Sequence, residues 1–170
     1  MDIFVEQLIK KKAGPKDYAI IFATILGAVI LVMASVIFLI QIALLVLIGV
    51  CFGAYYLITS RSLEFEYSVT NGSITIDKVI SRRKRKRVIA VEAHDIEDMG
   101  KFKPEVARNK SGFKTVFASQ YDDGRDAWYF CAHTAKEGNV LVVFDPDEKV
   151  LNAIKPFMPR QVSFVVFGRH

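Results

Sequence analysis

A single uncharged stretch limits what this chain can fold into more than any other feature does. No charged side chain occurs in Tyr18–Ser60, a run of 43 residues. One straight helix of that length would reach about 64 Å, roughly twice the hydrocarbon thickness of a bilayer. Two helices of bilayer length fit better, and we place them at residues 18–38 and 41–58, with the turn near residues 40–41. A cleaved signal peptide fits poorly because the apolar run is too long.

Basic residues flank this stretch on both sides. Four lysines precede it, and Arg61 and a later basic run follow it. Positive residues favour the cytoplasmic side of a membrane, and two spans return the chain to the side that it left. The sequence therefore predicts a multi-pass protein of the cell membrane with both termini in the cytoplasm. Cys51 lies in the second span and Cys131 in the later domain, so no disulfide is expected between them.

Small residues spaced four apart occur in both predicted spans. They are Ala23, Gly27, Gly49 and Gly53. Such pairs let the backbones of membrane helices approach closely. We expect them to pack the two helices against each other. Association between copies through the same faces is a second interpretation, and the absence of any special role is a third.

The uncharged stretch divides the chain into three parts. The apolar residues of the first part, residues 1–17, can share one face of a helix: Phe4, Val5, Leu8 and Ile9. This pattern predicts a short helix at the membrane interface. Residues 18–60 form the two-helix transmembrane hairpin. Residues 62–170 form a separate cytosolic domain.

Short alternating segments make residues 62–170 β-rich. In LEFEYSVT, which starts at Leu63, apolar and polar side chains alternate as in a half-buried strand, and Asn71-Gly72 then predicts a hairpin turn. Further strand candidates follow in the order of a meander, about six or seven in all: SITIDKVI, RVIAVEA, FKTVFAS, AWYFCAH, NVLVVFD and QVSFVVF. A helix is expected at residues 146–155 with Asp145 as its N-cap. We predict an antiparallel barrel or sandwich with a C-terminal helix.

One segment and the order of the elements carry a family resemblance. The segment YSVTNGSITIDKVISRRKRKRVIAVEAHDIEDM, which begins at Tyr67, resembles membrane-attached bacterial pleckstrin-homology-like domains. Their pattern is Tyr-x-[Ile/Val]-Thr, a turn, a strand, a basic approach and an apolar strand that leads to Asp-Ile, here Asp95 and Ile96. Through MDIFVEQL, GAYYLITS, YSVTNG and RKRKR, the whole chain also resembles an uncharacterised family of small two-span membrane proteins from Gram-positive bacteria. These resemblances imply a fold and a topology but no activity.

Six consecutive basic residues are the densest charge in the chain. They are Arg82, Arg83, Lys84, Arg85, Lys86 and Arg87. Without them, residues 61–170 would carry 13 basic and 15 acidic side chains, so the surplus of positive charge is local. The turn at Asn71-Gly72 sends the chain back toward the membrane. We therefore predict that the run is a membrane-proximal loop that faces anionic lipid head groups.

Two other interpretations of the basic run stay open. One is a solvated loop or topology signal, and the other is contact with an acidic protein or nucleic acid, although a domain without broad positive charge makes nucleic acid the weaker partner. In lipid-binding pleckstrin-homology domains, the basic loop usually joins the first two strands. Here that connection is the Asn-Gly turn, so the resemblance implies no phosphoinositide site.

Two pairs of residues have side chains that suit catalysis or metal binding. His94 and Asp95 are neighbours in the sequence, and we expect their side chains to point apart. Cys131 and His133 share one face of a predicted strand, which gives at most half a metal site. A packed cysteine beside an exposed histidine is the better interpretation.

The remaining motifs favour structural roles. Residues 122–124 are typical of a turn and lack the later ligands of a calcium loop. Tyr121, Trp128 and Tyr129 suit core packing better than a ligand surface. We therefore predict no metal, no cofactor and no enzyme activity.

Together these features predict a membrane-anchored cytosolic module that binds or scaffolds. Its expected partners are the lipid bilayer with its anionic head groups and an unidentified protein, and a homo-oligomer is also compatible with the sequence. An accessory subunit of a membrane complex is the alternative. A membrane enzyme that acts on a lipid or nucleotide substrate is the third hypothesis.

Overall fold

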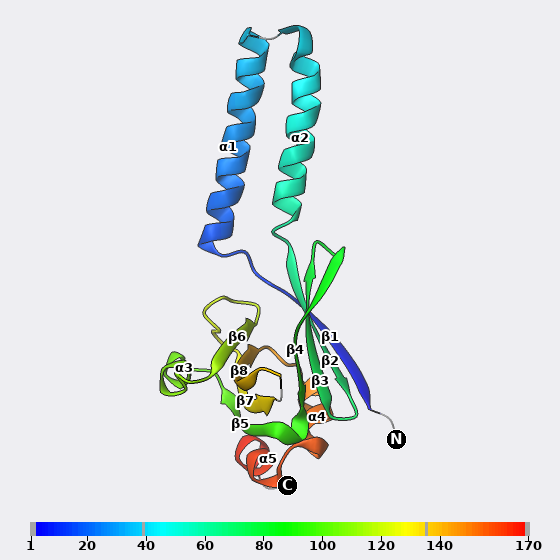
Figure 1. The fold of residues 1–170 in the computed structure, drawn as a ribbon, viewed down its shortest axis with the longest axis vertical. Coiled ribbons are helices and arrows are strands. Elements are labelled where there is room, and N and C mark those ends of the chain that lie inside the picture. The colour runs from blue at the N-terminus through cyan, green and yellow to red at the C-terminus, as the bar shows by residue number, and fades with distance from the viewer. Residues whose placement is uncertain (1–2, 39, 135, 169–170) are drawn as a thin grey trace. The chain divides into compact units, whose positions relative to one another are not determined.

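The structure is a computed structural model that describes residues 3–38, 40–134 and 136–168. The chain forms two compact units: Met1–Lys12 with Glu64–His170, and Ala13–Leu63. Figure 1 shows the helical pair of the second unit and the two sheets of the first. The helical unit is therefore inserted between the first strand of the β-rich unit and the strands that follow.

The inserted unit is a hairpin of two apolar helices. Helix α1 covers Pro15–Phe38, a 3₁₀ turn covers Ile40–Ile42, and α2 covers Ala43–Thr59. Both helices are long and apolar enough to cross a membrane, and within the described residues only Ser35 of the two helices is buried. Soluble proteins rarely leave so large an apolar surface uncovered. The predicted pair of apolar helices is confirmed.

The glycines of the hairpin do not lie at a close contact between its helices. A Cβ atom added to Gly27, Gly49 or Gly53 would meet no atom within 4 Å. Ala23 is exposed as well. The packing of α1 against α2 through these residues stays a prediction.

The N-terminal segment is a strand, and the interfacial helix expected there was wrong. Strand β1 (Phe4–Lys10) pairs antiparallel with β2 (Leu63–Thr70), across the inserted hairpin. Val5 and Ile9 pack against the core from alternate positions of β1. The partner of β1, strand β2, follows only after the inserted hairpin. The local sequence pattern therefore did not show that residues 4–10 form a strand.

The first sheet has the strand order β1-β2-β3-β4. Strand β3 covers Ser73–Ile80 and β4 covers Lys84–Glu92, and the two pair antiparallel with a β-bulge at Ile76/Asp77. The predicted turn between β2 and β3 is present, and both Asn71 and Gly72 have positive φ angles. Strands β1 and β4 are the two edges of this sheet.

The second sheet has the order β5-β7-β8-β6. Its strands are β5 (Ile96–Lys101), β6 (Lys114–Ala118), β7 (Trp128–Thr134) and β8 (Gly138–Phe144). Strand β6 pairs parallel with β8, whereas β7 pairs antiparallel with β5 and with β8. Strands β6, β7 and β8 were predicted from the sequence, whereas β5 was not. The expected meander was wrong, because β6 pairs with β8 and not with a strand next to it in the sequence.

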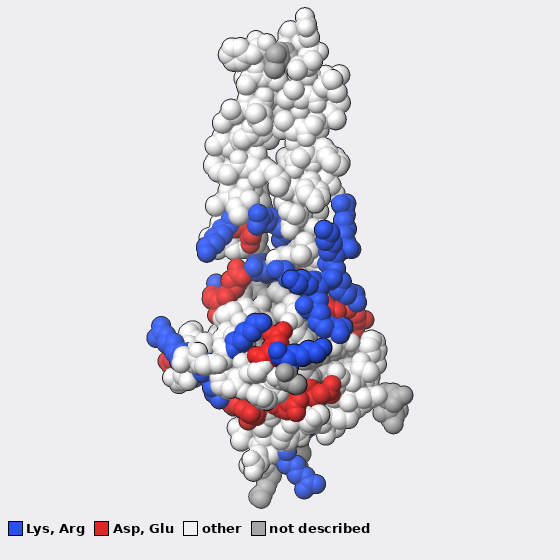
Figure 2. Space-filling view, in the orientation of Figure 1, with Lys and Arg blue, Asp and Glu red and all other residues white. Residues whose placement is uncertain are grey.

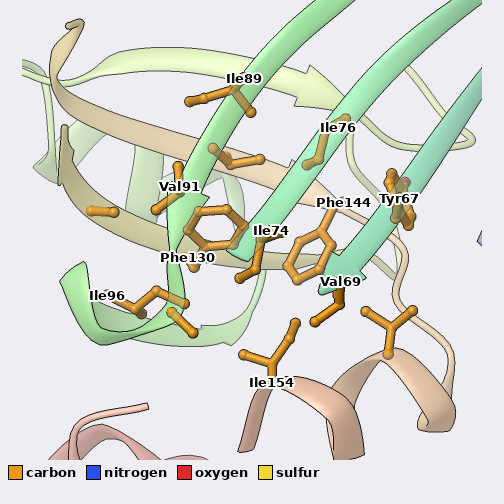
Figure 3. Packing of buried hydrophobic residues seen from close by; sticks show 14 of the residues in the cluster. Tyr67, Val69, Ile74, Ile76, Ile89, Val91, Ile96, Phe130, Phe144 and Ile154 are labelled. Carbon is orange, nitrogen blue, oxygen red and sulfur yellow. The ribbon is translucent and has the colours of Figure 1, made fainter. Parts of the chain in front are cut away.

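One hydrophobic core joins both sheets. Figure 3 shows its side chains from the two sheets and from α4 pointing toward one another. Phe130 and Phe144 make an edge-to-face contact with ring centroids 5.2 Å apart, and Tyr67 makes a similar contact with Phe144. The buried Tyr67 hydroxyl donates to the Ala118 carbonyl and accepts from the Asp145 amide, so its one polar group is satisfied. The sheets form an open sandwich.

The expected helix near the C-terminus is present, with a different cap. Helix α4 covers Glu148–Ile154, and the Asp147 carboxylate accepts from the Val150 amide at 2.8 Å. Asp145, the predicted cap, instead accepts from the Gln120 amide at 2.6 Å.

Two further helices were not predicted. Helix α3 covers Pro104–Asn109, and α5 covers Arg160–Phe167, where a last strand was expected. Val162 and Val166 of α5 pack against the core. Their spacing of four is that of one helical face, which outweighs the β-propensity of the valines.

Candidate functional site

The basic run is not a loop over its whole length. Only residues 81–83 form the turn, and Lys84–Arg87 begin β4, so the predicted loop over residues 82–87 was wrong for its last four residues. Ser81 and Arg82 have φ angles of 53° and 55°, and the Arg83 amide donates to the Ile80 carbonyl at 3.0 Å. Positive φ at both central residues is the pattern of a type I′ hairpin turn.

Three of the six basic residues make ion pairs within the sheet. Arg82 Nε lies 3.2 Å from Glu64, Arg85 Nη2 lies 2.5 Å from Glu66, and Arg87 Nε lies 3.2 Å from Asp77. The three acidic partners come from β2 and β3, so the pairs connect β4 to both inner strands. These arginines therefore have a structural role whatever else they contact.

Of these three acidic partners, Glu66 most needs a counter-charge, because its side chain is only 6% exposed. Burial raises the pKa of the Glu66 carboxyl, a hydrogen bond with Glu6 raises that pKa further, and the nearby Arg85 lowers it. A buried carboxylate without a counter-charge is costly. Arg85 therefore supplies the positive charge that offsets the buried Glu66 carboxylate.

The other three basic residues point into solvent. Arg83, Lys84 and Lys86 are exposed, and no ion pair involves them within the described residues 3–38, 40–134 and 136–168. Unpaired cations at close spacing make this the part of the run that is available to an anionic ligand.

The basic turn lies at one defined end of the sheet. Because β3 returns antiparallel to β2, residues 81–83 lie beside the start of β2, and the contact of Arg82 with Glu64 is consistent with this. At this same end, β1 finishes at Lys10 opposite Glu64. The turn therefore lies where the chain leaves the β-rich unit for the helical hairpin and re-enters it. Figure 2 shows Lys and Arg gathered on one part of this face of the molecule, with a band of Asp and Glu below them.

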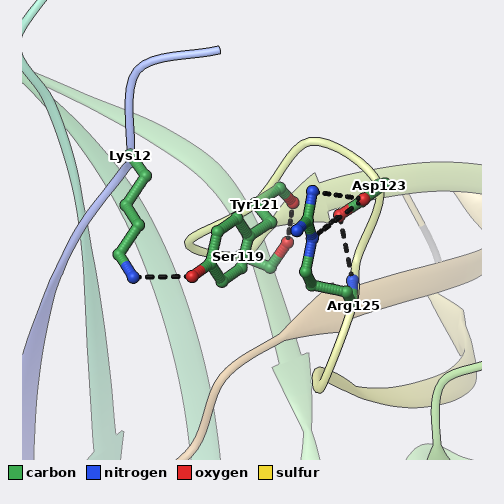
Figure 4. A network of polar contacts seen from close by, with 5 residues as sticks. All are labelled: Lys12, Ser119, Tyr121, Asp123 and Arg125. Carbon is green, nitrogen blue, oxygen red and sulfur yellow. Dashed lines mark hydrogen bonds and ion pairs between the residues drawn. The ribbon is translucent and has the colours of Figure 1, made fainter.

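A network of polar contacts holds the last residues before the hairpin (Figure 4). Lys12 Nζ donates to the Tyr121 hydroxyl at 2.6 Å, and its backbone amide donates to the Gln120 carbonyl at 2.9 Å. The ammonium of Lys12 and the guanidinium of Arg125 each lie 4.6 Å from the Tyr121 ring centroid. Asp123 in turn pairs with Arg125 at 3.0 Å. The loop between β6 and β7 therefore anchors the segment that leads to α1.

The aromatic residues do not form a shared ligand surface. Tyr121 takes part in the network just described, Trp128 packs partly against the core, and the Tyr129 hydroxyl donates to Asp98 at 3.1 Å. Burial is the main cause that raises the pKa of Tyr129 to about 12. Each ring is thus occupied by a separate structural contact.

The cysteine and histidine on β7 differ in environment. Cys131 is buried, and burial raises the pKa of its thiol to about 11. The thiol is therefore protonated at neutral pH. His133 is exposed, with Nδ1 2.7 Å from Asn139 Oδ1.

His94 and Asp95 do not point apart, as was expected from their positions. His94 Nε2 lies 3.2 Å from Asp95 Oδ1, and both side chains are exposed. In the part of the chain that the structure describes, no group of three His, Cys, Asp or Glu side chains is placed to hold a metal ion. The pair therefore remains an exposed contact on the surface.

The chain combines two packed four-stranded sheets with an inserted pair of apolar helices. The family model described as Bacterial PH-like domain (DUF6106) matches residues 1–164, and the protein belongs to this family. The match includes β1 and the inserted hairpin, which agrees with β1 being part of the first sheet. Comparison with curated proteins and with solved structures gives no match. The family supports a binding or scaffold module.

Proposed function

We propose that this protein is a membrane-anchored binding module whose free basic residues contact anionic lipid head groups on the cytoplasmic side of the membrane. One observation supports the proposal above the others. Arg83, Lys84 and Lys86 are exposed and make no ion pair in the described residues, at the end of the sheet where both connections to the apolar hairpin begin.

The connections limit how far this end can lie from a membrane that the hairpin crosses. Residues 11–14 join β1 to α1, and residues 60–62 join α2 to β2. An extended residue spans at most about 3.6 Å, so the shorter connection reaches about 14 Å. That distance is an upper limit of just under two Debye lengths, each about 8 Å at physiological ionic strength.

The size of the effect indicates what the contact can do. A basic residue near an anionic surface contributes about 1 kcal/mol, so three contribute at most about 3 kcal/mol. The apolar hairpin anchors the chain far more strongly than that. The basic residues therefore orient the β-rich unit at the membrane rather than recruit the protein to it.

Hydrogen exchange of the full chain in nanodiscs tests this proposal. Backbone amides of residues 81–87 should exchange more slowly in discs that contain phosphatidylglycerol than in discs of phosphatidylcholine alone. Added salt should remove the difference, because the surface potential is screened.

Two matched variants complete the test. In the first, Arg83→Gln, Lys84→Gln and Lys86→Gln together should abolish the lipid-dependent protection. In the control, Lys103→Gln, Arg108→Gln and Lys149→Gln remove the same charge from exposed positions elsewhere and should leave the protection intact. Equal exchange in both lipids for the unaltered chain would contradict the proposal.

A further inference from the structure

The free edge of β4 is uncovered along its second half. Strand β4 ends the first sheet, and a groove of about 450 Å³ follows it. Six consecutive residues, Arg87–Glu92, line one side of the groove, and Thr134, Lys136 and Glu137 line the other. Because six consecutive residues of β4 line it, the groove runs along this strand. The edge of β4 is therefore open to another chain there.

The strand at the opposite edge of the same sheet, β1, contacts the segment that enters α4. The Gln7 side chain of β1 donates to the Asp145 carbonyl at 3.0 Å and accepts from the Asp147 amide at 2.9 Å. The segment that enters α4 therefore lies against β1. An uncovered edge readily pairs with another strand, and proteins usually protect it with charge or with a covering segment. In β4, only the first four residues, Lys84–Arg87, protect the edge with a run of charge.

The sequence around β4 is complementary to itself. Basic residues 82–87 precede the centre of the strand, the apolar residues 88–91 form that centre, and the acidic residues Glu92, Asp95 and Glu97 follow it. Strand β4 ends at Glu92, and Asp95 lies in the turn that follows and lines the same groove. When two copies of β4 pair antiparallel, the basic half of each approaches Glu92 and Asp95 of the other. The two basic runs then lie at opposite ends and do not repel each other at close range.

Side-chain burial leaves the centre of the strand available. Ile89 and Val91 are buried in the core of their own unit, Val88 is half-buried and Ala90 is exposed. The Ala90 side chain therefore lies on the outer face of the sheet, opposite the core, and does not obstruct backbone pairing at the edge of β4.

We infer that two copies of this protein associate through the free edges of β4, antiparallel, so that their first sheets become continuous. The paired strands include Lys84 and Lys86, two of the exposed cations proposed to contact lipid, but the inference does not depend on lipid contact.

Light scattering and native mass spectrometry of the full chain, in detergent micelles and in phosphatidylcholine nanodiscs, test the inference. The unaltered chain should be a dimer. Ala90→Lys should raise the dissociation constant about tenfold or more, because two like charges would face each other near the twofold axis. Thr75→Lys is the matched control, since Thr75 pairs with Ala90 in register on β3, one strand away from the edge. It should leave the dimer intact.

Cysteine crosslinking supplies an independent readout. Single cysteines at Val88, Ala90 and Glu92, in a chain with Cys51→Ala, should give a disulfide-linked dimer for at least one position. Thr75→Cys should give none, because the two Cβ atoms would lie too far apart for a disulfide. A monomer, or a dimer that survives Ala90→Lys and forms no crosslink at β4, would overturn the inference.

Discussion

At the scale of single residues, the basic run divides into two groups that the sequence could not separate. Arg82, Arg85 and Arg87 pair with Glu64, Glu66 and Asp77, whereas the other three stay exposed. Six identical charges in a row carry no signal of this division. It depends on which side chains β2 and β3 bring beside β4, and on the bulge that resets the register there.

The turn before β4 contains a strained residue. Arg82 has a φ of 55°, and a left-handed conformation costs roughly 1–2 kcal/mol for a residue with a Cβ atom. Arg82→Gly should therefore stabilise the protein by about 1 kcal/mol, because the exposed pair with Glu64 that it removes contributes little. Thermal unfolding in detergent micelles measures the change. Arg83→Gly, at a neighbour without a positive φ, should give no gain, and an equal gain in both variants would contradict this explanation.

Cys131 gives the protein a dependence of stability on alkaline pH. Its thiol pKa is about 11 in the folded chain and close to 9 in a solvated thiol. The raised pKa means that folding favours the protonated form, so this stabilisation is complete below pH 9 and is lost as the pH rises through 11. The free energy of unfolding should fall more steeply over this interval in the native chain than in Cys131→Ala. Parallel curves would show that the thiol is not buried as described.

At the scale of elements, the alternating strands and the apolar helices were predictable because their patterns are local. Strand β1 was not, because Phe4, Val5, Leu8 and Ile9 fit a helical face as well as a strand, and its partner β2 lies beyond the hairpin. Helix α5 was missed because its valines favour strands, while the core contacts of Val162 and Val166 require a helix. The groove beside β4 could not be inferred, since its far side comes from the turn between β7 and β8.

The β-rich unit should not fold well without its first strand, β1. A fragment of residues 62–170 lacks β1 and exposes the edge of β2. In contrast, a chain in which a short Gly-Ser linker joins Lys12 to Glu64 keeps the whole β-rich unit. The linked chain should unfold cooperatively at a higher temperature than the fragment, as followed by circular dichroism. Equal midpoints would mean that β1 contributes nothing to the unit.

At the scale of the whole molecule, one chain combines an apolar hairpin with a binding module whose free cations lie where the hairpin begins. The flanking basic residues predict that both ends of the hairpin are cytoplasmic. Reporter fusions after Ser60 and after residue 170 should both report the cytoplasm. A periplasmic or extracellular signal from either fusion would place the basic turn on the wrong side of the membrane for anionic lipid.

The most direct measurement of lipid contact is photo-crosslinking from the basic turn in native membranes. A photoreactive amino acid in place of Arg83, in the full chain, should capture phospholipids with anionic head groups, identified by mass spectrometry. The same photoreactive amino acid in place of the exposed Lys103, just after β5 of the second sheet, should capture far less lipid. Adducts at Arg83 that are protein or nucleic acid, with no phospholipid among them, would contradict the account.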